Sequence, residues 1–443
     1  MSEWVTAPLH SLAEIRVSNV DKKTVPSERP VRLCNYMDVY GNDYIRSDIP
    51  FMEATANAAE ISRFKVDHGD VMITKDSETP SDIGIPAVVM DQIDDLVCGY
   101  HLALIKPNRN VVDSVYLAKQ LATDETARYF GRYAAGSTRY GLSNGAIAKT
   151  QIRLVPLRHQ KKIAAILTSI DTAIEKTEAL IEKHQQIKAG LMHDLFTRGV
   201  LPNGQLRPPR EQAPELYQET AIGWIPADWK ARSVGIVIES IADGPFGSNL
   251  KTEHYVVDPG VRVVRLQNVA EYEYNDADRA YVANRHAAFL LRNKVLGGDV
   301  LIAGLGEERY PVGRACCYPD SLPPAINKAD CFRARCKPDV MANKFFMLFL
   351  NSELARRQIR RYEQGVTRPR INTGNLKRID VCIPTLDEQH AIVARFESMQ
   401  AGIHDLQESA EKLRNQKLGL MQDLLTGKVP VKVDTEVAGP LHA

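Results

Sequence analysis

The sequence predicts an α+β protein made of two mixed α/β domains separated by two long helices that form an antiparallel coiled coil. Three observations predict this internal two-fold repeat. The second half of the 443-residue chain aligns on the first at a shift of about 229 residues. Each half contains one long run of apolar residues with heptad spacing, which is typical of a coiled-coil helix. Before each run, short segments rich in β-branched residues alternate with helical segments.

The repeat extends over most of the chain. Three pairs of segments align at the shift of 229 residues: Lys188–Thr197 with Lys417–Thr426, Gly136–Arg139 with Gly365–Arg368, and Gly69–Ile73 with Gly298–Ile302. A unit of this size that occurs only twice is too large and too rare for a solenoid. We therefore expect two copies of one module.

Each long helix is predicted from an uninterrupted seam, in which the steps between apolar positions alternate four and three. The predicted seam residues are Ile163, Leu167, Ile170, Ile174, Ile181 and Leu191 in the first helix, and Ile392, Phe396, Met399, Ile403, Leu406 and Leu420 in the second. Polar residues also fall on the seam, at Thr177, His184, Lys188 and Lys417. We favour side chains that fix the register or snorkel to solvent over a hidden site. Each apolar face is too narrow for its helix to stand alone, so the two helices most simply pair with each other. A whole module lies between them in sequence, and an antiparallel pair would place the two modules at opposite ends.

These signals predict the domain boundaries. The expected segments are a first mixed domain at 1–155, a first long helix at 156–198, a proline-rich linker at 199–228, a second mixed domain at 229–384, a second long helix at 385–427 and a tail at 428–443. Pro156 and Pro384 precede the helices, and Gly199 and Gly427 follow them, as start and stop signals do. We expect the linker to run extended over the surface.

Within the two bodies, runs of β-branched residues predict strands and helical patterns predict helices. The predicted strands include Val71–Ile73, Ala87–Met90, Val261–Val264 and Val300–Ile302, and the predicted helices are Ser114–Ala122 and Asn343–Arg361.

The composition excludes several classes of protein. Hydrophobic residues make up 44% of the chain and charged residues 25%, which excludes a disordered or fibrous protein. No window approaches the ~18 consecutive apolar residues of a membrane helix, and the N-terminus lacks the pattern of a signal peptide. The seven cysteines are an odd number spread along the chain, so we expect a reducing, cytoplasmic location without disulfides.

Positive charge is concentrated at similar positions of the two copies, although the net charge is only +1. Between Thr126 and Ile170 there are eight basic residues and no acid: Arg128, Arg132, Arg139, Lys149, Arg153, Arg158, Lys161 and Lys162. Between Leu354 and Ile379 eight basic residues accompany a single acid, Glu363: Arg356, Arg357, Arg360, Arg361, Arg368, Arg370, Lys377 and Arg378. A charge run is usually a solvated helix face, but its recurrence in both copies favours contacts with nucleic-acid phosphates.

No catalytic motif is found. The sequence lacks a P-loop, an H-E-x-x-H zinc motif and a G-x-S-x-G nucleophile elbow. A zinc site built from Cys316, Cys317, Cys331 and Cys336 is disfavoured because the first copy has nothing equivalent. The Asp-Gly-Pro-Phe-Gly segment at Asp243–Gly247 is either a turn with a buried phenylalanine or a loop that contacts a partner, and both interpretations stay open. We therefore expect a protein that is not an enzyme and binds no metal.

Taken in order, the motifs resemble the specificity (S) subunit of type I restriction-modification enzymes, over nearly the whole chain. Both copies contain a Gly-Asp-Val-[Met/Leu]-Ile strand, a Gly-x-Thr-Arg-x-x-[Leu/Ile] segment, a [Val/Ile]-Pro step into Gln-x-x-Ile, and a closing Gly-Leu-Met-x-Asp-Leu. The second copy opens with Ile222-Gly-Trp-Ile-Pro226 and Trp229 and adds the Asp-Gly-Pro-Phe-Gly loop.

The resemblance implies that each body, at 1–155 and 229–384, is a target recognition domain that reads one half of a split DNA sequence. Because the first body lacks the Asp-Gly-Pro-Phe-Gly loop, the implied target is asymmetric. The two helices resemble spacer regions that pair antiparallel, dock two modification (methyltransferase) subunits and set the distance between half-sites like a ruler. S-adenosylmethionine, ATP and Mg are then expected on the methyltransferase and restriction/translocase subunits, and no cofactor on this chain.

The expected contacts with double-stranded DNA come from the basic runs and the loops. Arginine and lysine neutralise phosphates without reading sequence, whereas bases are read by side chains that enter the major groove. The expected DNA-binding residues are Arg128, Arg132, Thr138, Arg139 and Lys149 in the first copy, and Phe246, Ser248, Lys251, Arg357, Arg361, Thr367, Arg368, Arg370 and Lys377 in the second.

Two alternatives stay open, a specificity subunit of a methylation-only system and a stand-alone DNA-binding scaffold protein. An enzyme fused to a recognition module is disfavoured, because no catalytic constellation is found.

Overall fold

A computed structural model of the chain describes residues 4–257, 260–307 and 309–433. It contains two compact units, each formed by one body and the adjoining halves of two long helices. Within the described ranges, unit 1 comprises residues 4–179 and 407–433, and unit 2 comprises residues 180–406. The long helices are α6 (Leu157–Thr197) and α12 (Leu386–Leu425), so the boundary between the units crosses both helices.

The body of unit 1 is built on a five-stranded sheet of order β2-β10-β6-β8-β4, with a three-stranded sheet, β5-β3-β9, beside it. Two further pairs are β1 with β12 and β7 with β11. The strands are β1 (Val5–Pro8), β2 (Ala13–Val17), β3 (Arg29–Cys34), β4 (Tyr44–Ile45), β5 (Met52–Ala56), β6 (Val71–Thr74), β7 (Asp76–Ser77), β8 (Pro86–Val89), β9 (Leu96–Cys98), β10 (Leu102–Pro107), β11 (Tyr140–Gly141) and β12 (Gln151–Leu154). The helices are α1 (Tyr36–Tyr40), α2 (Ala58–Phe64), α3 (Ser114–Leu121), α4 (Asp124–Tyr133) and α5 (Asn144–Ala148).

Both faces of the central sheet of unit 1 are covered. Val71 and Ile73 of β6 pack with α3 and with the long helices, whereas Met72 between them packs toward the three-stranded sheet. Successive side chains of a strand point to opposite faces, so burial of both faces explains the continuous apolar run. Polar caps fix the starts of the helices beside the sheet, since Asp113 and Ser143 accept hydrogen bonds from the backbone of α3 and α5.

The body of unit 2 contains a four-stranded sheet, β16-β24-β21-β22, and a five-stranded sheet, β17-β19-β18-β23-β20. Two pairs, β13 with β14 and β15 with β25, complete it. The strands are β13 (Tyr217–Thr220), β14 (Gly223–Pro226), β15 (Lys230–Ser233), β16 (Ile238–Ala242), β17 (Tyr255–Val256), β18 (Val261–Val264), β19 (Tyr281–Val282), β20 (Lys294–Val295), β21 (Val300–Ala303), β22 (Ala315–Cys317), β23 (Ala325–Asn327), β24 (Cys331–Cys336) and β25 (Asp380–Ile383). The helices are α7 (Val234–Val237), α8 (Asn284–Ala287), α9 (Asn343–Asn351), α10 (Glu353–Tyr362) and α11 (Thr373–Leu376).

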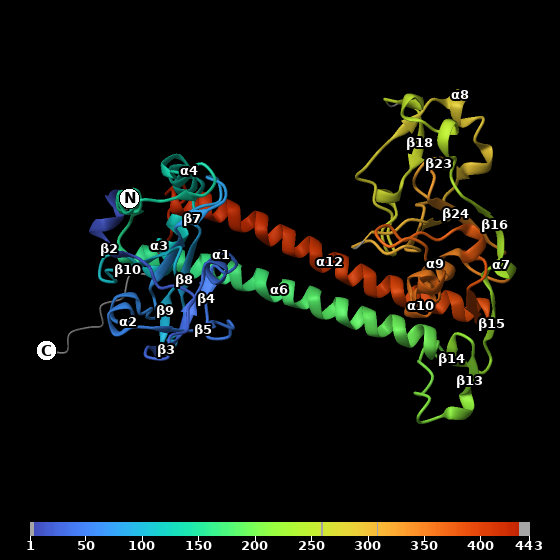
Figure 1. Ribbon diagram of the computed structural model, residues 1–443, viewed down its shortest axis with the longest axis horizontal. Helices are drawn as coiled ribbons and strands as arrows, with labels where there is room; N and C mark the ends of the chain where they lie inside the picture. Colours follow the sequence, from blue (N-terminus) through green and yellow to red (C-terminus); the bar gives the residue numbers. More distant parts are fainter. Residues whose placement is uncertain (1–3, 258–259, 308, 434–443) are drawn as a thin grey trace. The chain divides into compact units, whose positions relative to one another are not determined.

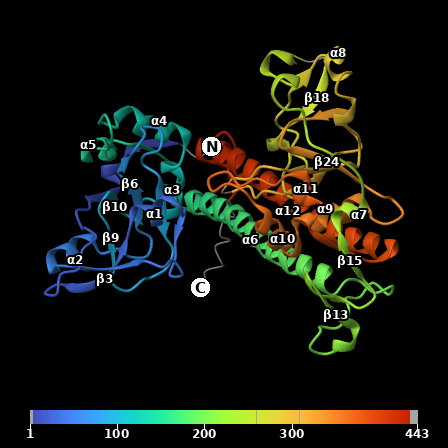
Figure 2. The same cartoon turned by 45° about the vertical axis from the view of Figure 1, so that its right-hand side comes forward.

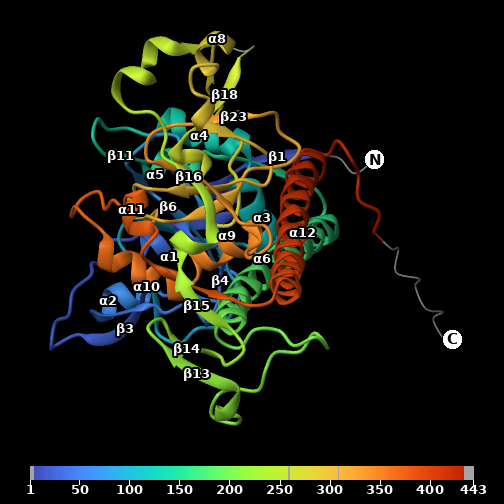
Figure 3. The ribbon, with the colours of Figure 1, turned by 90° about the vertical axis from the view of Figure 1, so that its right-hand side faces the viewer.

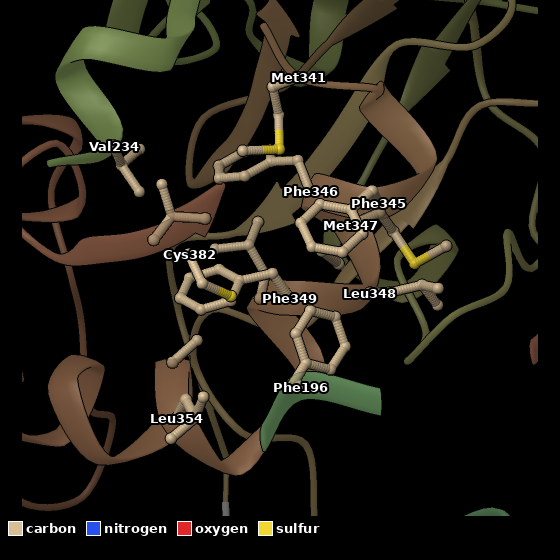
Figure 4. Packing of buried hydrophobic residues seen from close by; sticks show 14 of the residues in the cluster. Phe196, Val234, Met341, Phe345, Phe346, Met347, Leu348, Phe349, Leu354 and Cys382 are labelled. Atoms are coloured by element: carbon tan, nitrogen blue, oxygen red, sulfur yellow. The ribbon is translucent and has the colours of Figure 1, made fainter. Parts of the chain in front are cut away.

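The main core of unit 2 lies between the four-stranded sheet, α9 and the long helices. Phe345, Phe346 and Phe349 of α9 are almost fully buried, and the ring of Phe196 from α6 packs on two of them (Figure 4). Their centroids lie 5.3 Å (Phe345) and 5.9 Å (Phe349) from that of Phe196. The end of α6 is therefore anchored to the unit 2 body by aromatic packing.

In each unit the two long helices lie side by side (Figures 1 and 2), and Figure 3 shows them nearly end-on. In unit 1, Asp171 and Glu178 of α6 form ion pairs with Lys417 and Arg414 of α12 at 2.7 and 2.5 Å. From the first ion pair to the second, the residue number increases in α6 and decreases in α12, so the helices are antiparallel. All the predicted seam residues are buried or half-buried: Ile163, Leu167, Ile170, Ile174 and Leu420 in unit 1, and Ile181, Leu191, Ile392, Phe396, Met399, Ile403 and Leu406 in unit 2.

A buried glutamine fixes the start of each long helix in the same way. Gln160 of α6 accepts a hydrogen bond from the backbone of Asp113 and donates to the carbonyls of Val111 and Val155. The equivalent contacts of Gln389 in α12 involve the backbone of Ala342, Val340 and Pro384, respectively. The Gln-x-x-Ile motif thus ties each helix to its own body.

Two expectations about local structure were wrong. The helix predicted over Asn343–Arg361 is two helices, α9 and α10, because Ser352 is extended and its side chain caps α10 instead of continuing α9. The linker is not simply extended, because β13 and β14 form a hairpin within it. Arg207 of the linker is buried and forms an ion pair with Glu388 of α12 at 2.5 Å, which holds the linker against the helix.

Candidate nucleic-acid interface

Short amphipathic helices present two arginines at equivalent places in the two units. In α4 of unit 1, Arg128 and Arg132 are exposed, while Phe130 faces the core. In α10 of unit 2, Arg357 and Arg361 are exposed at the positions shifted by 229 residues. Spacing by four residues places each pair on one helix face. No ion pair joins these four arginines to a carboxylate in the described part of the chain, so their charge is available to a ligand.

The Thr-Arg segments form closed loops that expose their tips. In unit 2, Gln364 and Arg370 exchange backbone hydrogen bonds of 2.9 and 2.8 Å, and Thr367 and Arg368 between them are exposed. Gly365 begins the loop with a φ of +90°, which a residue with a side chain rarely adopts. The structure therefore holds this loop away from the core.

The corresponding loop of unit 1 has the same construction. Ala135 and Gly141 exchange backbone hydrogen bonds of 3.0 and 2.9 Å. Thr138 and Arg139 are exposed between them, and so is Lys149 after α5. Figure 2 shows α4 and α5 together at one end of unit 1, and Tyr129 of α4 donates a hydrogen bond of 3.0 Å to the carbonyl of Ala146 in α5.

Several members of the basic runs have structural partners. Arg153 pairs with Glu125 at 2.7 Å, and Arg360 pairs with Glu353 at 2.5 Å. Arg356 is half-buried and donates to the carbonyl of Val312 at 2.8 Å. The runs are therefore less uniformly available to phosphate than the sequence suggests, whereas Lys377 remains exposed.

The Asp-Gly-Pro-Phe-Gly loop lies against the turn between β23 and β24. A Cβ atom on Gly244 would come within 1.9 Å of the backbone of Lys328, so only glycine allows this approach. Burial raises the pKa of Asp243 to about 6, although its carboxylate accepts hydrogen bonds from the backbone of Gly244 and Asp330.

The side chain of Phe246 in the same loop is 52% exposed, so the interpretation as a turn with a buried phenylalanine is wrong. Lys251 is also exposed, and the side chain of Ser248 lies outside the described part of the structure.

A cavity of about 890 Å³ lies beside Arg368 in unit 2, and Gln267 and Tyr310 contribute to its lining. Arg314 holds its wall together, because this buried guanidinium donates to the carbonyls of Val269 at 2.7 Å and Leu305 at 3.2 Å. The hollow is therefore a preformed feature of the loop surface.

In unit 1, two lysines and two aspartates form a charged group between the body and the helix pair; Lys119 and Asp171 are buried, Lys417 is half-buried and Asp43 is exposed. We call Asp43, Lys119, Asp171 and Lys417 the unit 1 ion cluster. Lys119 lies 2.9 Å from Asp43 and 2.8 Å from Asp171, and Lys417 lies 3.0 and 2.7 Å from the same carboxylates. Tyr44 donates a hydrogen bond of 2.6 Å to Asp171. Burial raises the pKa of Asp43, but Lys119 and Lys417 lower it by more, so the net pKa lies below its usual value.

The equivalent position of unit 2 is largely aromatic. The ammonium of Lys188 lies 5.0 Å from the ring centroid of Tyr272 and 5.8 Å from that of Phe396, and it donates to Gln400 at 3.0 Å. Burial lowers the pKa of Lys188, and the charges of Glu271 and Glu273 oppose this only in part. We call Lys188, Tyr272, Phe396 and Gln400 the unit 2 aromatic cluster.

The architecture and motifs match a known protein family. Residues 1–184 and 295–413 match the family described as the type I restriction modification DNA specificity domain. The chain belongs to this family. The resemblance inferred from the motifs is thereby confirmed.

Curated relatives of the chain are specificity subunits as well. The chain is 24% identical over 341 residues to the type I restriction enzyme MjaVIII specificity subunit of Methanocaldococcus jannaschii, covering 74% of this chain and 73% of the relative. It is 23% identical over 289 residues to the type I restriction enzyme EcoBI specificity subunit of Escherichia coli, covering 64% and 57%.

Two solved structures share the fold. The S subunit of a type I restriction-modification system from M. genitalium aligns with a TM-score of 0.54 and 12% identity, over 96% of both chains. A chain from a structure described as the basis of complex assembly and conformational transition of the type I R-M system aligns with a TM-score of 0.56 and 16% identity, over 96% of this chain and 98% of the other. At these identities the likeness concerns the fold alone.

Among the described residues, no group of three or more His, Cys, Asp or Glu side chains is placed to hold a metal ion. Burial raises the pKa of the Cys331 and Cys336 thiols to about 12, which disfavours the thiolates that zinc would need. No helix in the described ranges is both long and apolar enough to cross a membrane.

Sequence reasoning missed some residues that shape this surface. Asp330 was not predicted, although its side chain pairs with the candidate residue Arg370 at 2.8 Å. In unit 1, His101 occupies the corresponding turn and lies 2.6 Å from Asp76. Neither residue lies in a motif, and their partners are 40 and 25 residues away, so only the fold brings them together.

Proposed function

We propose that this chain is the DNA-sequence-specificity subunit of a type I restriction-modification complex and that it reads an asymmetric bipartite target in double-stranded DNA. The observation that carries this is the recurrence, at equivalent places, of exposed arginines that form no ion pair within the described ranges: Arg128, Arg132 and Arg139 in unit 1, and Arg357, Arg361 and Arg368 in unit 2. Cations of this kind fix a protein on the phosphate backbone. The exposed residues Thr138, Thr367, Lys149, Lys377 and Lys251 extend the two surfaces, and Phe246 and Arg370 belong to the unit 2 surface. Ser248, whose side chain lies outside the described structure, remains an expected DNA contact from the sequence.

We further propose that the two bodies, at 1–155 and 229–384, are two copies of one recognition domain. Contacts that repeat at the shift of 229 residues support this. A Cβ atom on Gly84 would collide with Phe130, and one on Gly313 would collide with Ile359. The ion pair of Asp70 with Lys106 corresponds to that of Asp299 with Arg335. Loops such as Asp243–Gly247 differ between the copies, which accounts for an asymmetric target.

The helix pair is proposed to dock two methyltransferase subunits and to set the spacing between half-sites. In unit 1 the helix pair has a hollow of about 500 Å³, to which Ile166, Ile170 and Leu413 contribute apolar side chains. S-adenosylmethionine, ATP and Mg chemistry belong in this proposal to the methyltransferase and restriction/translocase subunits. This chain contributes recognition without catalysis.

The test is a genome-wide map of N6-methyladenine in cells with the partner methyltransferase, compared with a matched strain lacking only this chain. We expect a new asymmetric split motif that depends on the chain. Unchanged methylation, while the partner is shown to bind the chain, would contradict the proposal and favour the scaffold alternative. Cleavage of unmethylated DNA in the same strain distinguishes full restriction from a methylation-only system.

A further inference from the structure

The backbone of Arg370 is fixed from two sides at the edge of the unit 2 loop surface. It exchanges two hydrogen bonds with Gln364 and forms a β-bridge with Leu305. The neighbouring Pro369 accepts a hydrogen bond of 2.8 Å from Gly306. The side chain therefore starts from a rigid position, although 56% of it is exposed.

The partner of this side chain, Asp330, is fixed as well. Asp330 occupies the left-handed region with a φ of +62°, which few residues other than Gly, Asn and Asp adopt readily. Its N–H donates to the carboxylate of Asp243 at 3.1 Å, and its carbonyl accepts from Gly304 at 2.7 Å. The strained turn aims the carboxylate of Asp330 at Nη2 of Arg370, 2.8 Å away.

One contact through Nη2 leaves most of the guanidinium free. Nη1 and Nε of Arg370 have no hydrogen-bond partner among the described residues. A guanidinium held at one end by a carboxylate keeps its planar fork in one orientation, which reduces the entropy lost on binding. Such a fork matches the O6 and N7 acceptors of guanine in the major groove.

We propose that Arg370, oriented by Asp330, reads a guanine in the half-site that unit 2 recognises. This inference rests on the proposed function, because it needs DNA bound to the loop surface of unit 2. Arg368 on the same loop has no carboxylate partner in the described structure, so it serves as the contrast. A cation that no carboxylate orients suits a phosphate, which carries no sequence information.

The equivalent position of unit 1 offers different chemistry. Gly141 takes the place of Arg370, and a Cβ atom there would come within 2.9 Å of the Asp76 carboxylate. His101 takes the place of Asp330 with a φ of +71°, and it binds Asp76 together with Lys75. Near this position unit 1 therefore has the Asp76 carboxylate, a hydrogen-bond acceptor, whereas unit 2 has the Arg370 guanidinium, a donor. The guanine contact is thus specific to the unit 2 half-site.

The test compares N6-methyladenine maps made with the partner methyltransferase present and this chain in wild-type, Arg370→Gln, Arg370→Lys and Arg368→Gln forms. For both Arg370 variants we expect preference for guanine at one position of one half-site to fall about 10-fold or more. The other half-site and the spacing should not change. Arg368→Gln should reduce methylation evenly over all sites without changing the motif.

The outcomes separate the inference from the proposed function. If the wild-type chain directs no motif, the proposed function fails. If it directs a motif but both Arg370 variants keep every base preference, or lose methylation evenly as Arg368→Gln does, the guanine contact is overturned. Should Arg370→Gln fail to fold in a thermal melt, Arg370→Lys decides, because it keeps the ion pair with Asp330 but lacks the fork. Asp330→Asn tolerates the left-handed turn and should weaken the same guanine position.

Discussion

At the same position of the helix pair, unit 1 joins two lysines to two aspartates around the buried Lys119–Asp171 pair, whereas unit 2 places one half-buried lysine against aromatic rings. The positions correspond at a shift of 229 residues: Lys417 with Lys188, Asp171 with Gln400, Asp43 with Tyr272, and Lys119 with Leu348. Buried ion pairs are costly to desolvate and gain only when every charge is matched, whereas aromatic packing tolerates small shifts. The comparison suggests that the unit 1 ion cluster fixes the register of the helices on the body, and the unit 2 aromatic cluster supplies apolar anchoring.

The largest expected effect comes from breaking the unit 1 ion cluster. Asp171→Ala leaves Lys119 and Lys417 to share Asp43 and removes the acceptor of Tyr44. Removing one partner of a buried pair costs about 3–5 kcal/mol. Hydrogen exchange of residues 407–425 should accelerate accordingly.

The matched control is Gln400→Ala in unit 2, which removes one hydrogen bond to Lys188. We expect a loss of about 0.5–1.5 kcal/mol, measured by exchange of residues 386–406. Equal losses in the two variants would contradict the distinction between the clusters.

Replacing the lysines themselves should destabilise unit 1 but not unit 2. Burial and Lys119 lower the pKa of Lys417, but Asp43 and Asp171 raise it by more, so its charge stabilises unit 1. The pKa of Lys188 is lowered by burial, so its charge opposes folding of unit 2. Lys417→Met should therefore destabilise unit 1 by about 1–3 kcal/mol, whereas Lys188→Met should be neutral or stabilising.

Thermal unfolding, with hydrogen exchange to assign the unit affected, checks the pair of variants. In the wild type, the contribution of Lys417 is present below pH 10.5 and is lost as the pH rises through its raised pKa. The penalty at Lys188 disappears as the pH rises from its lowered pKa to 10.5. Destabilisation by both substitutions to the same extent would remove the argument.

A smaller effect is expected from Asp243, which has no counterpart in the unit 1 loops. Its pKa rises from 3.8 to about 6 through burial, with the Asp330 charge adding to the shift and Arg370 opposing it. The folded state then binds more protons than the unfolded state between these values, so stability falls as the pH rises from about 4 to 6. Asp243→Asn should flatten this slope in hydrogen exchange of residues 243–250, while the unit 1 loop 135–141 serves as the internal control. If the pH dependence of stability is unchanged in Asp243→Asn, another titrating group is responsible for it.

Much of the fold could be predicted from the sequence, because the strongest signals are local and periodic. The heptad seam predicted both long helices, and the β-branched runs predicted β18 and most of β6, β8 and β21. The break at Ser352 was missed, because one capping side chain outweighs a continuous helical pattern.

The candidate site could be predicted only in outline. The exposed arginines follow from charge runs, but nothing in the sequence separates them from Arg356, whose guanidinium binds the carbonyl of Val312. The ion cluster was also missed, since Asp43 and Lys417 are 374 residues apart in sequence. Contacts of this kind depend on the tertiary fold and leave no local pattern.

The most direct measurement of the central claim is an N6-methyladenine map for a chain lengthened by one heptad in both helices, after Ile181 and after Leu406. Lys188 contacts Gln400, so in the antiparallel pair the position seven residues before Lys188 faces the position seven residues after Gln400. The two insertions are therefore opposite each other, and the seam stays in register. If two bodies read separate half-sites at a distance set by the helix pair, the half-site sequences are unchanged and the gap between them changes. An unchanged gap, or altered half-sites, would contradict the account.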